Sequence, residues 1–272
     1  MEIIELPNPF DAPVYYEEIV DSTMDSSRSL AAKGAPHGTV ILADFQQKGR
    51  GRQGRPWVTE KGQNLMFTVL LRYTDINAFP KALSLRSGLA AALAIEEFIP
   101  AMAGSVLVKW PNDIMLGKIA KAKKAAGILV ESDGANVFIG MGVNLLQNDF
   151  PKDLYEKAVS LFSFFNENFP EFECPMLLAK NEAPLMLLEK ILANLHCELA
   201  VPKTPPLNSW NQRLLSRLYK LGHPVIFAEG ASDSHKILKG RLDGIGEDGE
   251  LIVTPDGKSK PMRFINGELR VY

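Results

Sequence analysis

One segment of the chain, Lys48 to Trp57, restricts the fold more than any other. It reads Lys-Gly-Arg-Gly-Arg-Gln-Gly-Arg-Pro-Trp and contains the spacing G-x-G-x-x-G. In a dinucleotide-binding fold this spacing follows a strand and opens a helix. Here Pro56 and a turn at residues 61–64 come next, and a β-rich run follows them. The sequence therefore excludes a doubly wound dinucleotide-binding fold.

The order of the other predicted elements indicates an α+β protein. β-rich runs predict strands at residues 14–20, 39–46, 65–72, 106–110, 127–131 and 137–143. Ser22 and Asp25 form an S-x-x-D capping box that predicts the start of a helix. Apolar spacing predicts a second helix over 80–99, with Pro80 in its first turn, and residues 152–220 are mostly helical in character. Because strands and helices do not alternate regularly, we predict an α+β fold and not a doubly wound α/β fold.

A different pattern begins after Leu221. Short β-rich runs between glycines predict strands at residues 225–228, 236–241, 251–254 and 262–265. Short strands with close turn signals are typical of a small β-barrel or sandwich. We therefore predict a larger domain over residues 1–220 and a small β domain over residues 221–272.

Composition places the chain among ordinary globular proteins, with 46% hydrophobic and 23% charged residues. Its apolar runs are far shorter than the ~20 residues that span a bilayer, so we expect no membrane partner. Residues 1–20 contain acidic residues but no Lys or Arg, which excludes a standard signal or transit peptide. Cys174 and Cys197 show no disulfide or metal-ligand spacing, and we expect a cytoplasmic location. A net charge of −2 means that any anion must be bound by a local cluster.

The Lys48–Trp57 loop is one such cluster. Its glycines allow the backbone to approach a ligand closely. Arg50, Arg52 and Arg55 add planar donors suited to phosphate or carboxylate. On composition alone, a solvated basic loop or an RNA-binding patch explains the segment equally well.

Three later clusters contain polar groups that could serve the same site. Lys109-Trp110-Pro111-Asn112-Asp113 ends a predicted strand, and its amide and carboxylate oxygens suit Mg²⁺, although Asn and Asp are also common in turns. Several lysines lead into the strand that begins near Gly127, and most of them are expected to decorate a loop. The glycines of residues 140–144 let a flat ligand approach, or else mark a β-bulge.

In this order along one chain, the motifs resemble those of the biotin protein ligase family. The resembling segments are residues 21–23, 46–57, 64–65, 109–113, 124–131 and 140–144. The C-terminal β segment is similar to the small SH3-like domain of that family. The resemblance implies a catalytic domain with a mixed β-sheet flanked by helices, the class II synthetase-like fold of biotin and lipoate ligases. It also implies a reaction in which biotin and ATP form biotinyl-5′-AMP, and a lysine of a biotin carboxyl carrier domain then displaces AMP.

The resemblance also implies residue roles, carried over by position. Biotin contacts fall to Ser22, Thr23, Gln46, Gly49, Arg50, Arg52, Trp57, Lys124, Gly127 and Gly140. ATP contacts fall to Arg50, Arg52, Lys109, Asn112 and Asn144. The catalytic residues are Lys124, Arg52 and Asp113. Mg²⁺ is expected to be held through the phosphates, with Asp113 as a further candidate ligand.

The sequence departs from the family pattern at two places. Met24 stands where the family often has Asn, and we expect a change in packing there. Residues 117–124 are rich in lysine, and the spacing Lys-x-x-Gly-Ile-Leu-x-Glu favours Lys124 over Lys123 as the catalytic lysine. The aromatic residue that stacks on adenine is not identified. The candidates are Phe162, Phe164 and Phe165, and we expect at least two of them to pack in the core.

The implied partners are biotin and the carrier domain of acetyl-CoA carboxylase or a related carboxylase. Only 20 residues precede Asp21, so we expect no DNA-binding domain and no DNA partner. A homodimer is left open. Two other functions also remain open, namely a lipoate or octanoate ligase of the same fold and an RNA-binding module without enzymatic activity.

Overall fold

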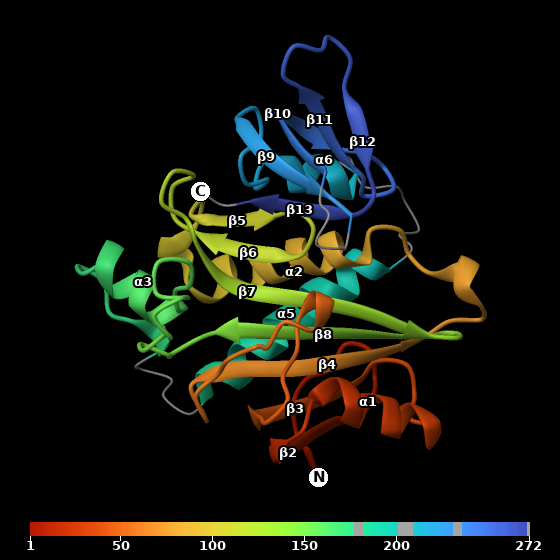
Figure 1. Cartoon of the computed structure of the whole chain (residues 1–272). Helices are drawn as coiled ribbons and strands as arrows, with labels where there is room; N and C mark the ends of the chain where they lie inside the picture. Colours follow the sequence, from red (N-terminus) through yellow and green to blue (C-terminus); the bar gives the residue numbers. More distant parts are fainter. Residues whose placement is uncertain (177–181, 201–208, 231–235, 271–272) are drawn as a thin grey trace.

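The computed structural model describes residues 1–176, 182–200, 209–230 and 236–270 (Figure 1). Part of the segment predicted to be helical between residues 152 and 220 therefore lies outside the described residues. Within the described ranges, no helix combines the length and the apolar character needed to cross a bilayer.

A large mixed sheet forms the centre of the molecule. Its strands are β1 (Glu2–Ile4), β2 (Val14–Val20), β3 (Thr39–Gln46), β4 (Asn64–Arg72), β5 (Val106–Lys109), β6 (Asp113–Leu116), β7 (Lys123–Asp133) and β8 (Asn136–Asn144). Their order across the sheet is β1-β2-β3-β4-β8-β7-β6-β5, and β2 and β3 run parallel while the other pairs are antiparallel. The predicted strands of this part of the chain are confirmed, whereas β1 and β6 were not predicted.

Helices cover both faces of this sheet. The described helices are α1 (Thr23–Ala32), α2 (Leu83–Phe98), α3 (Leu161–Asn168), α5 (Ala183–Leu199) and α6 (Trp210–Leu215), of which α1, α2 and α5 contact the sheet. The described residues also form the short 3₁₀ turns η1 (Arg52–Gly54), η2 (Ile76–Ala78) and η3 (Pro100–Met102). Figure 1 shows α1 in front of the sheet and the pair α2 and α5 behind it. The predicted start of the second helix at Pro80 is wrong, because α2 begins only after Ala82, whose left-handed backbone (φ 55°) precedes the helix.

The alternation along β4 explains this two-sided packing. Side chains of a strand point to opposite faces in turn. Phe67, Val69 and Leu71 join the large hydrophobic cluster that includes α2 and α5. Leu70 faces the other way and packs with residues of α1 and with Phe138 of β8. Both faces of the central strands are therefore covered by helices, at least in part.

A second sheet follows near the C-terminus. It contains β9 (Pro224–Glu229), β10 (Lys236–Ile245), β11 (Leu251–Pro255), β12 (Met262–Phe264) and β13 (Gly267–Arg270), in the order β12-β11-β10-β9-β13. The four predicted strands are confirmed, and β13 is additional. Among the described residues no pairing joins β12 to β13, so the SH3-like barrel stays a prediction, as does a domain boundary at residue 221.

The two sheets pack against each other through buried aromatic residues. Trp110, which is 2% exposed, donates a hydrogen bond from Nε1 to the carbonyl oxygen of Gly249 at 3.0 Å. Its ring lies 5.9 Å from that of Phe227, and Phe227 belongs to the same hydrophobic cluster as α2. The second sheet is thereby held beside the edge of the first where Lys109 and Asp113 lie.

Candidate active site

A cavity of about 780 Å³ opens on the α1 face of the large sheet. Its floor exists because β8 carries glycine where a side chain would otherwise fill the space. Phe138, Gly140 and Gly142 share one face of β8, and Phe138 packs under α1 while the two glycines lie beyond it. Gly127 of β7 lies directly opposite Gly142 and extends the low floor.

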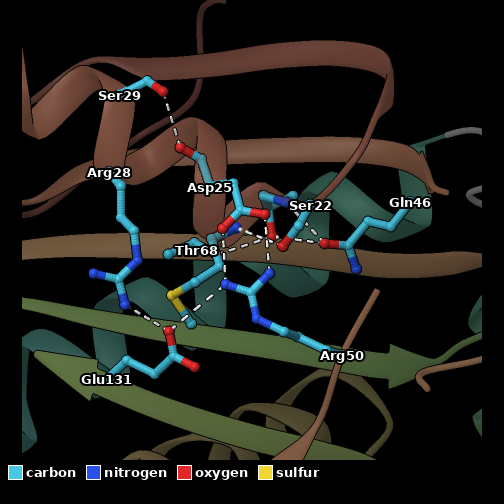
Figure 2. Close-up of polar contacts among 10 residues, drawn as sticks. Ser22, Asp25, Arg28, Ser29, Gln46, Arg50, Thr68 and Glu131 are labelled. Atoms are coloured by element: carbon cyan, nitrogen blue, oxygen red, sulfur yellow. Dashed lines mark hydrogen bonds and ion pairs between the residues drawn. The ribbon is translucent and has the colours of Figure 1, made fainter. Parts of the chain in front are cut away.

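Hydroxyl and amide groups at the start of α1 form one wall of the cavity. Oε1 of Gln46 accepts hydrogen bonds from the backbone N–H of Thr23 at 2.8 Å and from its Oγ1 at 3.1 Å. The hydroxyl of Thr68 donates to Oγ1 of Thr23 at 2.9 Å. Ser22 caps α1 by accepting from the N–H of Met24 (Figure 2). This wall offers groups that suit a neutral polar ligand ring.

The Lys48–Trp57 loop folds as a short hairpin across the cavity. The N–H of Trp57 donates to the carbonyl of Gly49 at 2.9 Å, and the N–H of Gly51 donates to that of Arg55 at 2.8 Å. Gly49 itself does not line the cavity. A Cβ at this position would meet the carbonyl oxygen of Trp57 at 3.1 Å, so Gly49 serves the turn of the hairpin.

Most cations of the loop are paired with carboxylates. Lys48 pairs with Asp21, and Arg55 pairs with Glu268 of β13, both at 2.7 Å. Arg50 also has a carboxylate partner, on helix α1. Among the described residues, Arg52 is the loop cation with no carboxylate within ion-pair distance. Positive charge that reaches the cavity from the loop therefore comes mainly from this residue.

Arg52 lies between the two sheets at the cavity wall. Its guanidinium donates to Oδ1 of Asn112 at 3.5 Å and to the carbonyl of Gly267 at 3.4 Å. Burial lowers the pKa of Arg52, and the nearby carboxylates of Asp113 and Glu268 partly offset this effect. A partly desolvated guanidinium with only neutral hydrogen-bond partners is well suited to receive an anionic ligand.

Two lysines converge on one carboxylate at the floor of the cavity. Nζ of Lys124 lies 2.6 Å from Oδ1 of Asp113, and Nζ of the buried Lys109 lies 3.6 Å from Oδ2. Burial lowers the pKa of Lys109. Burial alone would raise the pKa of Asp113, but Lys124 and Lys109 outweigh it and hold the pKa below its usual value. The cluster therefore brings two basic side chains and one carboxylate together beside the glycine floor.

Trp57 reaches back from the loop and lies flat on that floor. A Cβ on Gly142 would lie 2.5 Å from its indole ring, and one on Gly127 would lie 3.0 Å from it. The ring centroid is 5.4 Å from Nζ of Lys124. Nε1 of Trp57 is buried and has no partner among the described residues. This N–H can donate to a ligand that enters beside it.

The structure brings the sequence-predicted residues together. The cavity is lined by Ser22, Thr23, Gln46, Arg50, Arg52, Trp57, Lys109, Asn112, Asp113, Lys124, Gly127, Gly140 and Asn144. The side-chain N–H groups of Asn112 and Asn144 donate to the carbonyls of Ile128 and Val159, so both amides also tie neighbouring segments together. The individual roles of these residues stay predictions.

The donor set at Asp113 does not fit a magnesium ion held by the protein. One carboxylate oxygen faces Lys124 and the other faces Lys109, so a divalent cation would lie beside two ammonium groups. Within the described ranges, no three His, Cys, Asp or Glu side chains gather as a metal site would require. Asp113 is better explained as the residue that positions the two lysines.

Several lining residues and one contact differ from what the sequence predicts. Gly142, Thr68, Met24, Phe150 and Glu268 also line the cavity. Two of them had a signal in the sequence, since Gly142 lies in the glycine cluster that includes Gly140 and Met24 directly follows the motif at residues 21–23. The prediction that the carboxylate of Asp25 completes a capping box is wrong, because this carboxylate binds Arg50 instead.

The aromatic candidates for adenine stacking lie elsewhere. Phe164 and Phe165 are buried on α3, where both pack against Phe169, as expected for core residues. Phe162 is partly buried against the same hydrophobic cluster. None of the three lines the cavity.

Comparisons with known proteins agree with this geometry. The model of the biotin/lipoate A/B protein ligase family matches residues 16–147. The bifunctional ligase/repressor BirA of Bacillus spizizenii is 37% identical over 154 residues, which cover 54% of this chain and 45% of BirA, so the match spans under half of that relative. The biotin–[acetyl-CoA-carboxylase] ligase of Paracoccus denitrificans is 32% identical over 84% of this chain and 90% of its own length.

A solved structure shows the same architecture along nearly the whole chain. The biotin protein ligase of Aquifex aeolicus, in complex with biotin and ATP, superposes with a TM-score of 0.68 and 25% identity. The superposition covers 94% of this chain and 97% of that one. The large mixed sheet, the flanking helices and the separate C-terminal sheet are thus shared with a biotin protein ligase, as predicted. Together with the extent of the Paracoccus match, this shows that the chain belongs to the biotin/lipoate A/B protein ligase family.

Proposed function

We propose that the protein is an ATP-dependent biotin ligase that attaches biotin to a lysine of a biotin carboxyl carrier domain. The observation that carries this proposal is the Lys124–Asp113–Lys109 cluster beside the glycine floor and Arg52. It places positive charge where two anionic substrates must meet. The ligase relatives, with the Paracoccus protein matched over most of its length, support the substrates.

The first step joins the carboxylate of biotin to the α-phosphate of ATP. A carboxylate oxygen attacks the α-phosphorus, the bond to the bridging oxygen breaks, and pyrophosphate leaves. Both reactants are anionic, so the step requires cations that are already in place. Lys124 and Arg52 both line the cavity, and the largely buried Asp113 holds Lys124 in position. We expect Mg²⁺ to arrive bound to the phosphates, as part of the ATP substrate.

The second step transfers the biotinyl group. The neutral amine of the carrier lysine attacks the acyl carbon and releases one proton to solvent, an amide bond forms, and AMP leaves with the electrons of the broken anhydride bond. Water would hydrolyse the same anhydride, so the site must exclude it. The Lys48–Trp57 loop and the indole of Trp57 lie across the floor and are suited to this purpose.

The neutral wall is suited to the ring end of biotin. Thr23, Gln46 and Thr68 already form a hydrogen-bond chain, and Ser22 lies beside them. Such a wall can hydrogen-bond a ureido ring without adding charge. The remaining cations of the loop are paired with carboxylates, which does not favour an RNA-binding module.

Mass spectrometry of a carrier domain tests the proposal directly. The carrier is incubated with the protein, ATP, Mg²⁺ and biotin, and in parallel with octanoate or lipoate in place of biotin. We expect a mass gain equal to one biotinyl group and no gain with the other acids. A gain with lipoate or octanoate alone would identify the lipoate-ligase branch of the family instead. A homodimer and the absence of a DNA partner stay predictions, to be tested by sedimentation and by DNA-binding assays.

A further inference from the structure

We propose that Arg50 fastens the Lys48–Trp57 loop to the protein instead of binding substrate charge, and that Asp25 and Glu131 are the positioning residues that hold it. This inference rests on the proposed function, since it concerns the loop that would cover biotin and ATP. It also revises the roles that the resemblance assigned to Arg50. Figure 2 shows Arg50 extending from the loop toward the two carboxylates, one on α1 and one on β7.

Arg50 and Asp25 form a bidentate ion pair, a geometry that can hold the loop in place. Nη1 of Arg50 donates to Oδ2 of Asp25 at 2.9 Å, and Nη2 donates to Oδ1 at 2.7 Å. Nη2 also lies 3.7 Å from Oε2 of Glu131. Paired parallel hydrogen bonds fix the orientation of a guanidinium as well as its distance. Arg50 lowers the pKa of Asp25, so this carboxylate stays charged at neutral pH.

The carboxylates are themselves anchored. Arg28 of α1 donates to Oε2 of Glu131 at 2.6 Å, and its guanidinium lies 4.6 Å from the ring centroid of Phe138. Glu131 thus bridges Arg28 and Arg50 (Figure 2). The loop is tied to a helix and a central strand at one point.

Charge balance separates this contact from the substrate site. Two arginines and two carboxylates make up the network, so it offers no excess positive charge to an anion. Arg52 differs, because its described partners are the neutral oxygens of Asn112 and Gly267. The two arginines therefore have different roles. Arg50 keeps the hairpin attached to α1 and β7, whereas the guanidinium of Arg52 is available to bind an anionic ligand.

Limited trypsin digestion of the ligand-free protein tests the fastening without any substrate. Trypsin can cut after Arg52, and mass spectrometry follows that cut over time. We expect Asp25→Asn to speed cleavage by about threefold, the order expected for loss of a partly exposed ion pair. Asp21→Asn is the matched control, because Asp21 and Asp25 are both 51% exposed and both pair with a loop cation at 2.7 Å. Of these two carboxylates, only Asp25 forms a bidentate ion pair. Trypsin should therefore cleave the Asp21→Asn control at close to the wild-type rate.

Kinetics then separate positioning from chemistry. With Asp25→Asn we expect the KM for biotin in pyrophosphate exchange to rise by about threefold and kcat to change by less than about twofold. Asp25→Glu should recover part of the loss. Because both substitutions break the same contact, Asp25→Asn should add little to the cleavage rate of Arg50→Gln.

Two results would overturn the inference. The first is that trypsin cleaves Asp25→Asn at the wild-type rate, or cleaves Asp25→Asn and Asp21→Asn at equal rates. The other is a fall in kcat for Arg50→Gln as large as that for Lys124→Ala with the KM for biotin unchanged, which would return Arg50 to the reacting groups. Failure of the proposed function is distinguishable, because it appears as an absence of biotin-dependent exchange in the wild-type protein, whatever the trypsin result.

Discussion

Nζ of Lys124 lies 2.6 Å from Oδ1 of Asp113, with the carboxylate largely buried and the lysine facing the cavity. The pair keeps an ammonium group in place before any anion arrives. A cation that is positioned in advance stabilises developing negative charge without a reorganisation cost during the reaction. The contact therefore links the fold of the β6 and β7 strands to the proposed chemistry.

We expect Lys124→Ala to lower the rate of biotin-dependent ATP–pyrophosphate exchange by about a hundredfold or more, because a positioned cation is lost at the reacting carboxyl. Circular dichroism should show that the fold persists. Lys123→Ala is the control, since Nζ of Lys123 donates to the carbonyl of Tyr155 and this residue does not line the cavity. Exchange near the wild-type rate in Lys124→Ala would remove Lys124 from the mechanism.

We expect Asp113→Asn to reduce the free energy of unfolding by about 3 kcal/mol, because it leaves the buried Lys109 without its charged partner. Urea titration measures this change. Asp133→Asn, at the exposed end of β7, should change the value by less than about 0.5 kcal/mol. Equal midpoints for the two variants would show that Asp113 does not stabilise the cluster.

We expect Gly142→Ala to raise the KM for biotin by about tenfold, because a Cβ 2.5 Å from the Trp57 indole must displace a rigid ring. Gly140→Ala should have a smaller effect. Its new Cβ would meet Cε of Met24 at 2.9 Å, and the end of a flexible side chain can move aside. Equal KM values for the two variants would argue against Trp57 as part of the site.

We expect Arg52→Gly to release biotinyl-5′-AMP about tenfold faster than the wild type, because a cation at the cavity wall is lost. The freed anhydride should label lysines of a bystander protein such as serum albumin, which a biotin blot detects. Arg55→Gly should label much less, since Arg55 pairs with Glu268. Retention as tight as that of the wild type would contradict the assignment of Arg52.

We expect the Arg55–Glu268 contact to weaken in acid. Arg55 holds the pKa of Glu268 below its ordinary value of 4.5. A carboxyl whose pKa is lower in the folded state stabilises the protein at pH values above its ordinary pKa. This contribution disappears as the pH falls through the folded-state pKa. The pair is partly exposed, so Glu268→Gln should cost only about 0.5 kcal/mol of unfolding free energy at pH 7.

Urea titrations of wild type and Glu268→Gln at several pH values measure that difference. It should shrink as the pH falls below 4.5 and through the lowered folded-state pKa of Glu268, because the wild-type carboxyl then also becomes neutral. A difference that stays constant from pH 7 to pH 3 would show that the ion pair contributes nothing.

Local pattern was enough to predict most of the fold. The β-rich run at residues 65–72 identified β4, and Ser22 marked the start of α1 correctly. The start of α2 was misjudged, because Pro80 suits a helix locally while tertiary contacts place a left-handed residue at Ala82. Short strands such as β6 and β13 have too few residues for a periodic signal.

The site was harder to predict wherever it depends on distant residues. The pairing of Asp25 with Arg50 joins residues of two elements, and a capping motif gave the more local explanation of Asp25. Glu268 lies far from the motifs in sequence and reaches the cavity only through the pairing of β13 with β9. Such contacts follow from sheet topology, which local spacing does not encode.

The placement of β13 has a practical consequence for anyone handling this protein. Gly267 and Glu268 both bind arginines of the loop, and Arg270 still lines the cavity. A purification tag or reporter fused shortly after β13 would follow a residue that lines the cavity, so we expect it to obstruct a docking carrier. A fusion ahead of Met1 would instead emerge from β1, at the outer edge of the large sheet.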